Sequence, residues 1–346
     1  MMNELTERQK TILSVIVTLY TQTVSPVGSK VIADRYLKHT SSATVRNEMA
    51  GLEQMGYINH PHTSAGRVPT DKGYRYYVDS LNESRGVDSA EAGLIAREFR
   101  QQVKSIEELI ERTSKVLSFL TEQAGVVVYP TGAELALKRL QLIPHARHHL
   151  LVVLVATTGI VQSKIVDLEE EIPEEDLNRL SQFLNTELSG RLFVDIPAYL
   201  SLRFSDMQDA AVRKFQFVRD FIQNVFKSSG ERKVYVDGSR FVLKQPEFRS
   251  DARKTRLFFR ALENKEEFLN VFDEPLEPGE VRVRIGRENL QEEIWDCALV
   301  TARYHAQNRP LGALGVLGPK RMPYGRVISL VEHISRRLSD AFEELA

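Results

Sequence analysis

The chain has 346 residues, which is enough for two or three domains that each bury a core. Its composition, 42% apolar and 27% charged with a net charge of −1, is that of an ordinary globular protein and does not by itself indicate a nucleic-acid binder. No apolar stretch approaches the roughly 20 residues of a membrane helix, the N-terminus lacks a signal core, and the single cysteine excludes an internal disulfide, so we expect a cytoplasmic protein with no membrane partner.

Three short helices are expected at the N-terminal end. The first helix is expected within residues 4–20. Near its start, Thr6 is followed three places later by Gln9, which is the pattern of a capping box. A short second helix is expected over residues 28–37. A third helix begins at Ser41, because a serine at this place accepts hydrogen bonds from the first free amides.

The third helix has two different faces. Val45, Met49 and Leu52 recur at helical spacing and form one apolar stripe. The opposite face carries the small or polar side chains Ala43, Asn47, Ala50 and Gln54, flanked by Thr44, Arg46 and Gly51. An asparagine there can pair with an adenine edge, and an arginine with a guanine edge or a phosphate. A surface helix with a tolerant outer face has the same pattern, so this helix alone does not decide between the two.

The segment after the third helix is expected to form a compact hairpin. Pro61, Gly66 and Pro69 confine it to a tight turn between short strands. Its polar side chains are potential phosphate donors: His60, His62, Thr63, Ser64 and Arg67. Three helices and a hairpin in this order predict a winged helix-turn-helix, in preference to a polar surface loop. Lys and Arg exceed Asp and Glu only slightly in this region, so a single copy should bind DNA weakly and we expect a dimer.

Four stretches resemble one family, the heat-inducible transcription repressors called HrcA. They are PVGSK (26–30), SSATVRNEM (41–49), LEQMGYINHPHTSAGRVPTDKGYRYYVD (52–79) and LGALGVLGPKRMPYGRVISLVE (311–332). The resemblance implies a homodimer that binds an inverted-repeat operator in double-stranded DNA upstream of chaperone genes. It also implies a GroEL-type chaperonin as a partner, which unfolded protein occupies during heat stress and thereby relieves repression.

Site residues follow from the pattern and the resemblance together. Base contacts are expected from Thr44, Arg46 and Asn47, with close approach at Ala43 and Ala50 and a helix start at Ser41. Phosphate or minor-groove contacts are expected from Lys38, Ser42, His62, Thr63, Ser64 and Arg67.

The middle of the chain changes from helix to strand. A helix over 70–81 and a polar hinge at 86–93 precede one long amphipathic helix over 91–124. Three strands are then expected over 137–143, 150–157 and 160–168, followed by helices over 173–188 and 207–226. The last of these helices is apolar over much of its circumference. It is the expected dimer interface through Phe215, Val218, Phe221, Ile222 and Val225, unless it is a buried core helix.

The C-terminal part mixes strands with helices, so the predicted fold is α+β and multidomain. Strands are expected over 234–237, 281–285, 298–305 and 311–317, with helices over 251–272 and 324–345. The resemblance implies a GAF-like domain with a dimerising domain inserted into it. The expected domains are a winged helix at 1–80, a discontinuous GAF-like domain at 81–130 and 231–346, and an inserted domain at 131–230.

No enzymatic chemistry, cofactor or metal site is expected. A phosphate-binding loop requires G-x-x-x-x-G-K-[ST], and the run from Gly312 to Lys320 lacks both the spacing and the hydroxyl. Cys297 lies in an apolar run and is expected to be a buried hydrophobe. An alternative function remains, in which the GAF-like domain of a transcriptional regulator binds a small molecule in a polar-lined pocket.

Overall fold

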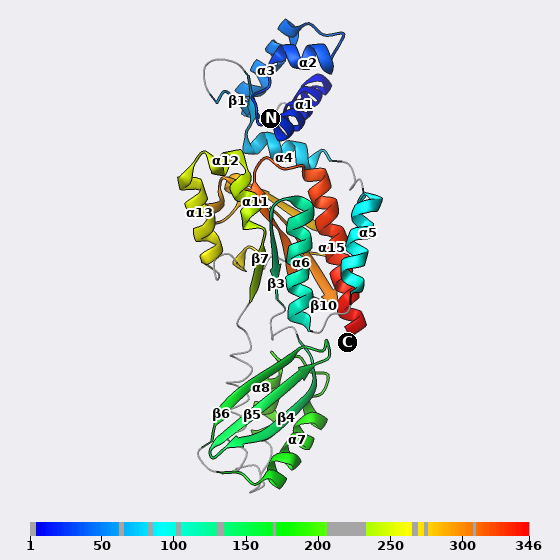
Figure 1. Ribbon diagram of the computed structural model, residues 1–346, viewed down its shortest axis with the longest axis vertical. Coiled ribbons are helices and arrows are strands. Elements are labelled where there is room, and N and C mark those ends of the chain that lie inside the picture. Colours follow the sequence, from blue (N-terminus) through cyan, green and yellow to red (C-terminus); the bar gives the residue numbers. More distant parts are fainter. Residues whose placement is uncertain are drawn as a thin grey trace.

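The computed structural model is elongated and has three units in a row (Figure 1). It describes residues 5–61, 66–81, 86–101, 105–129, 135–168, 171–205, 233–264, 269–272, 276–306 and 309–345. We call residues 5–81 the winged-helix unit, 86–129 with 233–345 the central unit, and 135–205 the distal unit. The predicted multidomain α+β fold is confirmed.

The winged-helix unit consists of the expected helices and hairpin. Its elements are α1 (Glu7–Thr23), α2 (Ser29–Arg35), α3 (Ser42–Gln54), β1 (Ile58–Asn59), β2 (Val68–Pro69) and α4 (Asp71–Asp79). The predicted capping box is confirmed, because Thr6 accepts from the Gln9 amide and the Gln9 side chain accepts from the Thr6 amide. β1 and β2 pair antiparallel. Ile12, Ile16 and Ile58 are among the side chains that form the buried core of the unit.

The central unit is built on one five-stranded sheet. Its strands are β3 (Ala124–Val128), β7 (Val234–Asp237), β8 (Val281–Ile285), β9 (Cys297–Ala306) and β10 (Arg309–Pro319). The spatial order is β7-β3-β10-β9-β8, and every neighbouring pair is antiparallel. In the chain, the distal unit is inserted between β3 and β7, which are neighbours in the sheet, and it lies at the end of the molecule opposite the winged-helix unit (Figure 1).

Helices cover both faces of this sheet. One face packs against α5 (Ser89–Arg100), α6 (Ile106–Thr121) and α15 (Tyr324–Leu345), and the other against α11 (Ser239–Lys244), α12 (Pro246–Arg249) and α13 (Ala252–Glu263). Two short 3-10 helices, η2 (Gly286–Glu288) and η3 (Glu292–Ile294), connect β8 to β9. The alternation of a strand explains the two covered faces, since Val126 packs in one cluster and Val127 in the other.

Two predicted helices have the wrong extent. The single helix expected over 91–124 is two helices, α5 and α6, because the backbone is extended at Gln101 and Ser105 starts a new helix by accepting from the Glu108 amide at 3.2 Å. The apolar pattern continues through this break and concealed it. The helix expected over 251–272 ends at Glu263.

The distal unit is a three-stranded antiparallel sheet with helices on one face. Its elements are β4 (Leu137–Ala146), β5 (His149–Ala156), β6 (Val161–Asp167), α7 (Glu174–Leu188) and α8 (Ile196–Ser205). The three predicted strands and the helix that follows them are confirmed. The helix expected over 207–226, with its five interface residues, lies outside the described residues. Among the helices that the structure describes, none is long and apolar enough to cross a membrane.

Candidate nucleic-acid interface

The helix α3 packs through one face and presents the other to solvent. Val45, Met49 and Leu52 are buried, which confirms the predicted apolar stripe. The outward side chains are Ala43, Arg46, Asn47 and Ala50, all exposed. An exposed helix face of two alanines, an arginine and an asparagine has the size and the hydrogen-bond donors that fit a DNA major groove.

The start of α3 is fixed by its own side chains. Ser41 Oγ accepts from the Thr44 amide at 3.1 Å and lies 2.9 Å from Thr44 Oγ1. Ser41 thus caps the helix as predicted, and the Thr44 hydroxyl is engaged in the same cap. Ser42 is exposed beside this end of the helix, where the free amides and the helix dipole favour an anion such as a phosphate.

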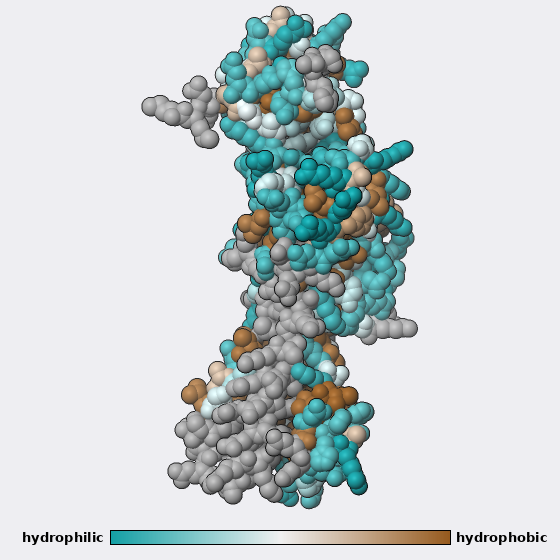
Figure 2. All heavy atoms as spheres, turned by 90° about the vertical axis from the view of Figure 1, so that its left-hand side faces the viewer, coloured by the Kyte–Doolittle hydropathy of each residue, from teal (hydrophilic) through white to brown (hydrophobic). Residues whose placement is uncertain are grey.

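Exposed cations lie in the segments that precede α3. Lys38 lies in the turn before it, and Lys30 and Arg35 lie on α2. All three side chains are exposed. On the side of the molecule seen in Figure 2, hydrophilic side chains predominate over the winged-helix unit. These charges fit the predicted role of this region in contacting phosphates.

The wing is held to α3 by a cluster of three charged or polar side chains. Arg67 donates to Glu53 Oε2 through Nε at 3.0 Å and Nη2 at 2.8 Å. His60 Nδ1 lies 2.5 Å from Glu53 Oε1, and its other ring nitrogen contacts Arg67. The backbones of Arg67 and Val27 also exchange two hydrogen bonds, at 2.9 and 3.0 Å. Arg67 is therefore directed at Glu53 in this structure, and its phosphate contact stays a prediction.

Glu53 was not among the site residues predicted from the sequence. It lies on the last turn of α3, and its partners in the wing follow seven and fourteen residues later. The only local signal is a carboxylate among several cations. The predicted tip residues His62, Thr63 and Ser64 lie outside the described part of the chain.

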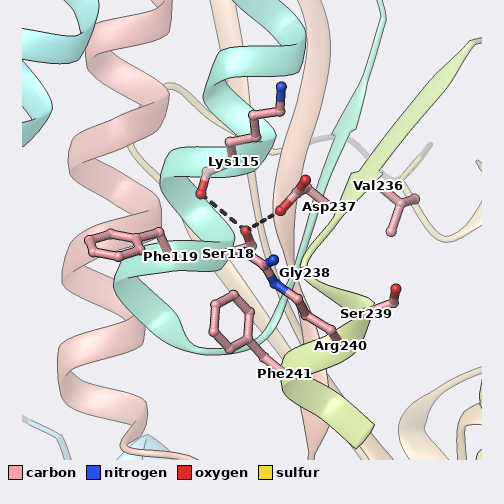
Figure 3. A pocket seen from close by; sticks show the side chains of 9 residues that line it. All are labelled: Lys115, Ser118, Phe119, Val236, Asp237, Gly238, Ser239, Arg240 and Phe241. Carbon is pink, nitrogen blue, oxygen red and sulfur yellow. Dashed lines mark hydrogen bonds between the residues drawn. The ribbon is translucent and has the colours of Figure 1, made fainter.

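A surface hollow of about 570 Å³ lies in the central unit where α6 meets the edge strand β7 (Figure 3). Phe119, Phe241 and Arg240 line it together with polar groups. Ser118 Oγ donates to Asp237 Oδ1 at 2.7 Å, and the other contact of this hydroxyl is the carbonyl of Lys115 at 3.0 Å. The polar pair is thus bonded within the protein itself. Ligand sensing in the central unit stays a prediction.

Comparison with known proteins assigns both ends of the chain. Residues 4–81 match the family model described as the winged helix-turn-helix transcription repressor, HrcA DNA-binding, and residues 107–328 match that of the HrcA protein C terminal domain. The heat-inducible transcription repressor HrcA of Desulforamulus reducens is 34% identical over 341 residues, covering 98% of this chain and 97% of that protein. The protein of the same name from Desulforudis audaxviator is 39% identical over 346 residues, covering 98% of each.

One solved structure shares the fold over the full length. It is the crystal structure of a protein described as hypothetical, and it superposes with a TM-score of 0.62 at 23% sequence identity, covering 99% of this chain and 100% of that one. This likeness supports the arrangement of the fold alone. The two family models and the full-length relatives settle the identity predicted from the sequence: the chain belongs to the HrcA family of heat-inducible transcription repressors.

Proposed function

We propose that this chain represses chaperone genes as a homodimer that binds an inverted-repeat operator in double-stranded DNA. The observation that carries the proposal is the outward face of α3, where Arg46 and Asn47 are exposed between the small residues Ala43 and Ala50. Two such helices related by a two-fold axis would read half-sites separated by about one or more DNA turns of 34 Å.

The residues have separate roles in this proposal. Asn47, Arg46 and Thr44 contact base edges, and the Thr44 hydroxyl also lies 2.9 Å from the capping hydroxyl of Ser41. Lys38 and Ser42 contact phosphates and fix the register of the helix in the groove. The wing, including His62, Thr63 and Ser64, contacts the flanking backbone or minor groove, and Arg67 reaches DNA only by exchanging Glu53 for a phosphate.

An apolar sheet face on the distal unit supports the homodimer. Ile143, Leu151 and Ile165 lie opposite one another on the three strands, and Val155 and Val161 form a second cross-strand pair on the same face. Ile143, Val161 and Ile165 are 40%, 59% and 49% exposed. The face also carries Arg139 beside Val155, and Gln141 and Ser163 beside Val153, so it is apolar in part. Its exposed aliphatic side chains favour burial against another surface, and a second copy supplies the same surface through a two-fold axis.

The β4 edge of the same sheet is less available for pairing with a strand of another copy. The Asn185 side chain on α7 accepts from the Leu140 amide and donates to the Leu140 carbonyl, both at 2.7 Å, and so takes the place of a neighbouring strand. Ser181 accepts from the Leu142 amide at 3.2 Å. Because these side chains close the β4 edge, we place the proposed dimer contact on the sheet face and not on this edge.

The other two units and the chaperonin also have roles in the proposal. The central unit is the GAF-like domain, and the distal unit with the residues up to 230 is the inserted dimerising domain. A GroEL-type chaperonin binds the chain before it dimerises, because the aliphatic sheet face is then uncovered. During heat stress unfolded proteins compete for the chaperonin, so fewer active dimers form and repression is relieved.

Operator footprinting of the purified full-length protein, with and without chaperonin, tests this function. We expect protection of two half-sites on one DNA face, with occupancy that rises when chaperonin is added. Protection of a single half-site by a monomer would contradict the dimer. Full occupancy without chaperonin at every temperature would contradict the proposed regulation and leave the operator assignment in place.

A further inference from the structure

The helix α4 is bonded on one side to the end of the recognition helix α3. Thr70 Oγ1 donates to the Gly56 carbonyl at 2.7 Å, and the Thr70 amide donates to the Tyr57 carbonyl at 3.0 Å. Lys72 Nζ donates to the Met55 carbonyl at 2.8 Å. A Cβ at Gly73 would lie 2.1 Å from the Tyr57 carbonyl oxygen, so the two segments are in direct backbone contact. A rotation of α4 therefore carries α3 with it.

The opposite side of α4 is bonded to the central unit by ion pairs. Asp71 Oδ1 lies 2.6 Å from Lys320 Nζ, in the loop that joins β10 to α15. Arg75, one turn later on α4, donates to Glu288 Oε1 at 2.8 Å and to the Val283 carbonyl at 2.5 Å. The two pairs engage different elements of the central unit, η2 and the β10–α15 loop.

An aromatic contact lies between the two ion pairs. Tyr74 and Tyr324 are 3% and 1% exposed, and their ring centroids are 6.0 Å apart. Tyr324 donates its hydroxyl to the Lys320 carbonyl at 2.6 Å, which fixes the loop that carries Lys320. A Cβ at Gly286 would lie 1.9 Å from an Asp71 carboxylate oxygen, so a glycine is needed for this approach.

Arg321 supplies a second attachment, at α1. Its Nη1 donates to the Thr21 carbonyl at 2.8 Å, and its Nε donates to Glu247 Oε1 on α12 at 2.6 Å. The side chain is only 12% exposed. Attachment at both α4 and the end of α1 opposes rotation of the winged-helix unit about either helix.

We propose that Lys320, Arg321 and Glu288 are positioning residues that hold the recognition helix in one orientation relative to the central unit. The inference rests on the proposed function, because it assigns to these residues the spacing between the two recognition helices of a dimer. The segment 318–321 (GPKR), which does not match a phosphate-binding loop, thus has a role in attaching the winged-helix unit to the central unit.

The physical consequence concerns two-site binding. A dimer gains affinity from its second half-site only when the two α3 helices are held at the span of the operator. Loss of the ion pairs leaves each winged helix folded and able to bind one half-site. It widens the range of α3 orientations and so lowers the effective concentration of the second helix at its half-site.

The test uses full-length Lys320→Met and Glu288→Gln, with DNA duplexes that carry one or two half-sites. We expect each variant to lose about tenfold in affinity for the two-site duplex and less than about twofold for the single half-site. Duplexes with one or two base pairs added between the half-sites separate positioning from folding. Wild-type protein should lose affinity steeply on them, whereas the variants should lose little.

A control variant breaks an ion pair inside the central unit. Arg326 donates to Glu91 Oε1 through Nε at 2.8 Å and contacts no residue of the winged-helix unit among the interactions that the structure describes. Arg326→Met should bind both duplexes like the wild type. Wild-type affinity and spacing dependence in Lys320→Met and Glu288→Gln would overturn the inference.

A measurement without DNA separates this inference from the proposed function. Spin labels at Gln54→Cys on α3 and Arg256→Cys on α13, in a Cys297→Ser background and diluted with unlabelled protein, report the distance between the two units. We expect one narrow distance distribution, which Lys320→Met broadens. An unchanged distribution would refute the positioning role even if DNA binding is confirmed, and a broadened one would uphold it even if no operator is bound.

Discussion

Glu53 at the end of the recognition helix receives Arg67 from the wing, with Arg67 Nη2 2.8 Å from Glu53 Oε2. The pair is partly buried, since the two side chains are 29% and 17% exposed. It joins the two elements that a winged helix uses on DNA, the recognition helix and the wing. We therefore expect the angle between the two elements to depend on the carboxylate of Glu53, which is occupied by Arg67 in this structure.

Glu53→Ala should loosen the wing. A partly exposed ion pair with hydrogen bonds contributes about 1 kcal/mol, so amide exchange at Val27 and Arg67 should accelerate about fivefold. Native-state hydrogen exchange measures both amides. Glu48→Ala is the matched control, because Glu48 lies on the same helix and pairs with Arg8 at 3.4 Å. Equal acceleration in both variants would show that the wing does not depend on Glu53.

Asn47→Ala should reduce discrimination at one base pair of each half-site. The loss of a bidentate amide–base contact costs about 1–3 kcal/mol, and binding to unrelated DNA should be unaffected. Competition between operator and single-base variants measures it. Glu48→Ala is the control, because Glu48 lies on the same helix and pairs with Arg8 at 3.4 Å. An Asn47→Ala protein that ranks all variants like the wild type would contradict base contact.

Lys38→Met should act differently from Asn47→Ala. A phosphate contact carries no sequence information, so operator and unrelated DNA should weaken alike. The slope of log affinity against log salt should fall by about one per subunit. Titrations at several salt concentrations measure this slope, and an unchanged slope would remove Lys38 from the interface.

Val153→Lys should dissociate the proposed dimer. Val153 lies in the centre of the outer sheet face, between Gln141 and Ser163 on the neighbouring strands. A charge there cannot be buried without a partner, so sedimentation should show monomers. Affinity for a two-site operator should fall about a hundredfold. Asn178→Lys places the same charge on the exposed side of α7, behind the sheet, and should remain dimeric. A dimeric Val153→Lys protein would exclude this face.

Acidification should destabilise the central unit in part through His333. Burial, followed by the charges of Arg337 and Arg336, lowers the pKa of His333 below its usual value of 6.5, and Asp340 and Glu332 oppose this. The unfolded chain then binds a proton before the folded one does, so stability is fully present above pH 6.5 and is lost as the pH falls toward the folded pKa.

Fluorescence of the single tryptophan, Trp295, reports this loss. The urea midpoint should fall between pH 7.5 and 5.5, and His333→Leu should make the fall smaller. An unchanged fall would assign it to other groups, such as His305, whose pKa burial also lowers.

Cys297 should be unreactive in the folded protein. It is 1% exposed, and burial raises the pKa of its thiol far above the usual range. A maleimide at pH 7.5 should modify it only at the rate of unfolding, and fully in denaturant. Rapid labelling of the native chain would show that the core opens readily at the start of β9, where Cys297 lies.

Local signals in the sequence located most elements. Thr6 with Gln9 marked the start of α1, and Pro173 marked the start of α7, because a cap acts within a few residues. The break before α6 was missed although Ser105 and Glu108 have the spacing of a cap, since the apolar pattern on either side dominated.

Long-range pairing had no such signal. Asp71 and Lys320 are 249 residues apart, and nothing beside either residue indicates the other. The order of the central sheet was equally hidden, because the strands flanking β3 come from positions far along the chain. Arg67 was selected for its charge alone. Only the fold shows that a carboxylate lies within reach of it.

The position of β3 has a consequence for the time at which the protein becomes complete. Val127 pairs with Tyr235 on one side and with Leu314 on the other. During synthesis, more than half of the chain must be added after β3 before its second neighbour, β10, is made. The winged-helix unit, which precedes it, is made first and is local in its contacts. Every newly made molecule thus passes through a period in which the winged-helix unit is complete and the central sheet that holds it is not.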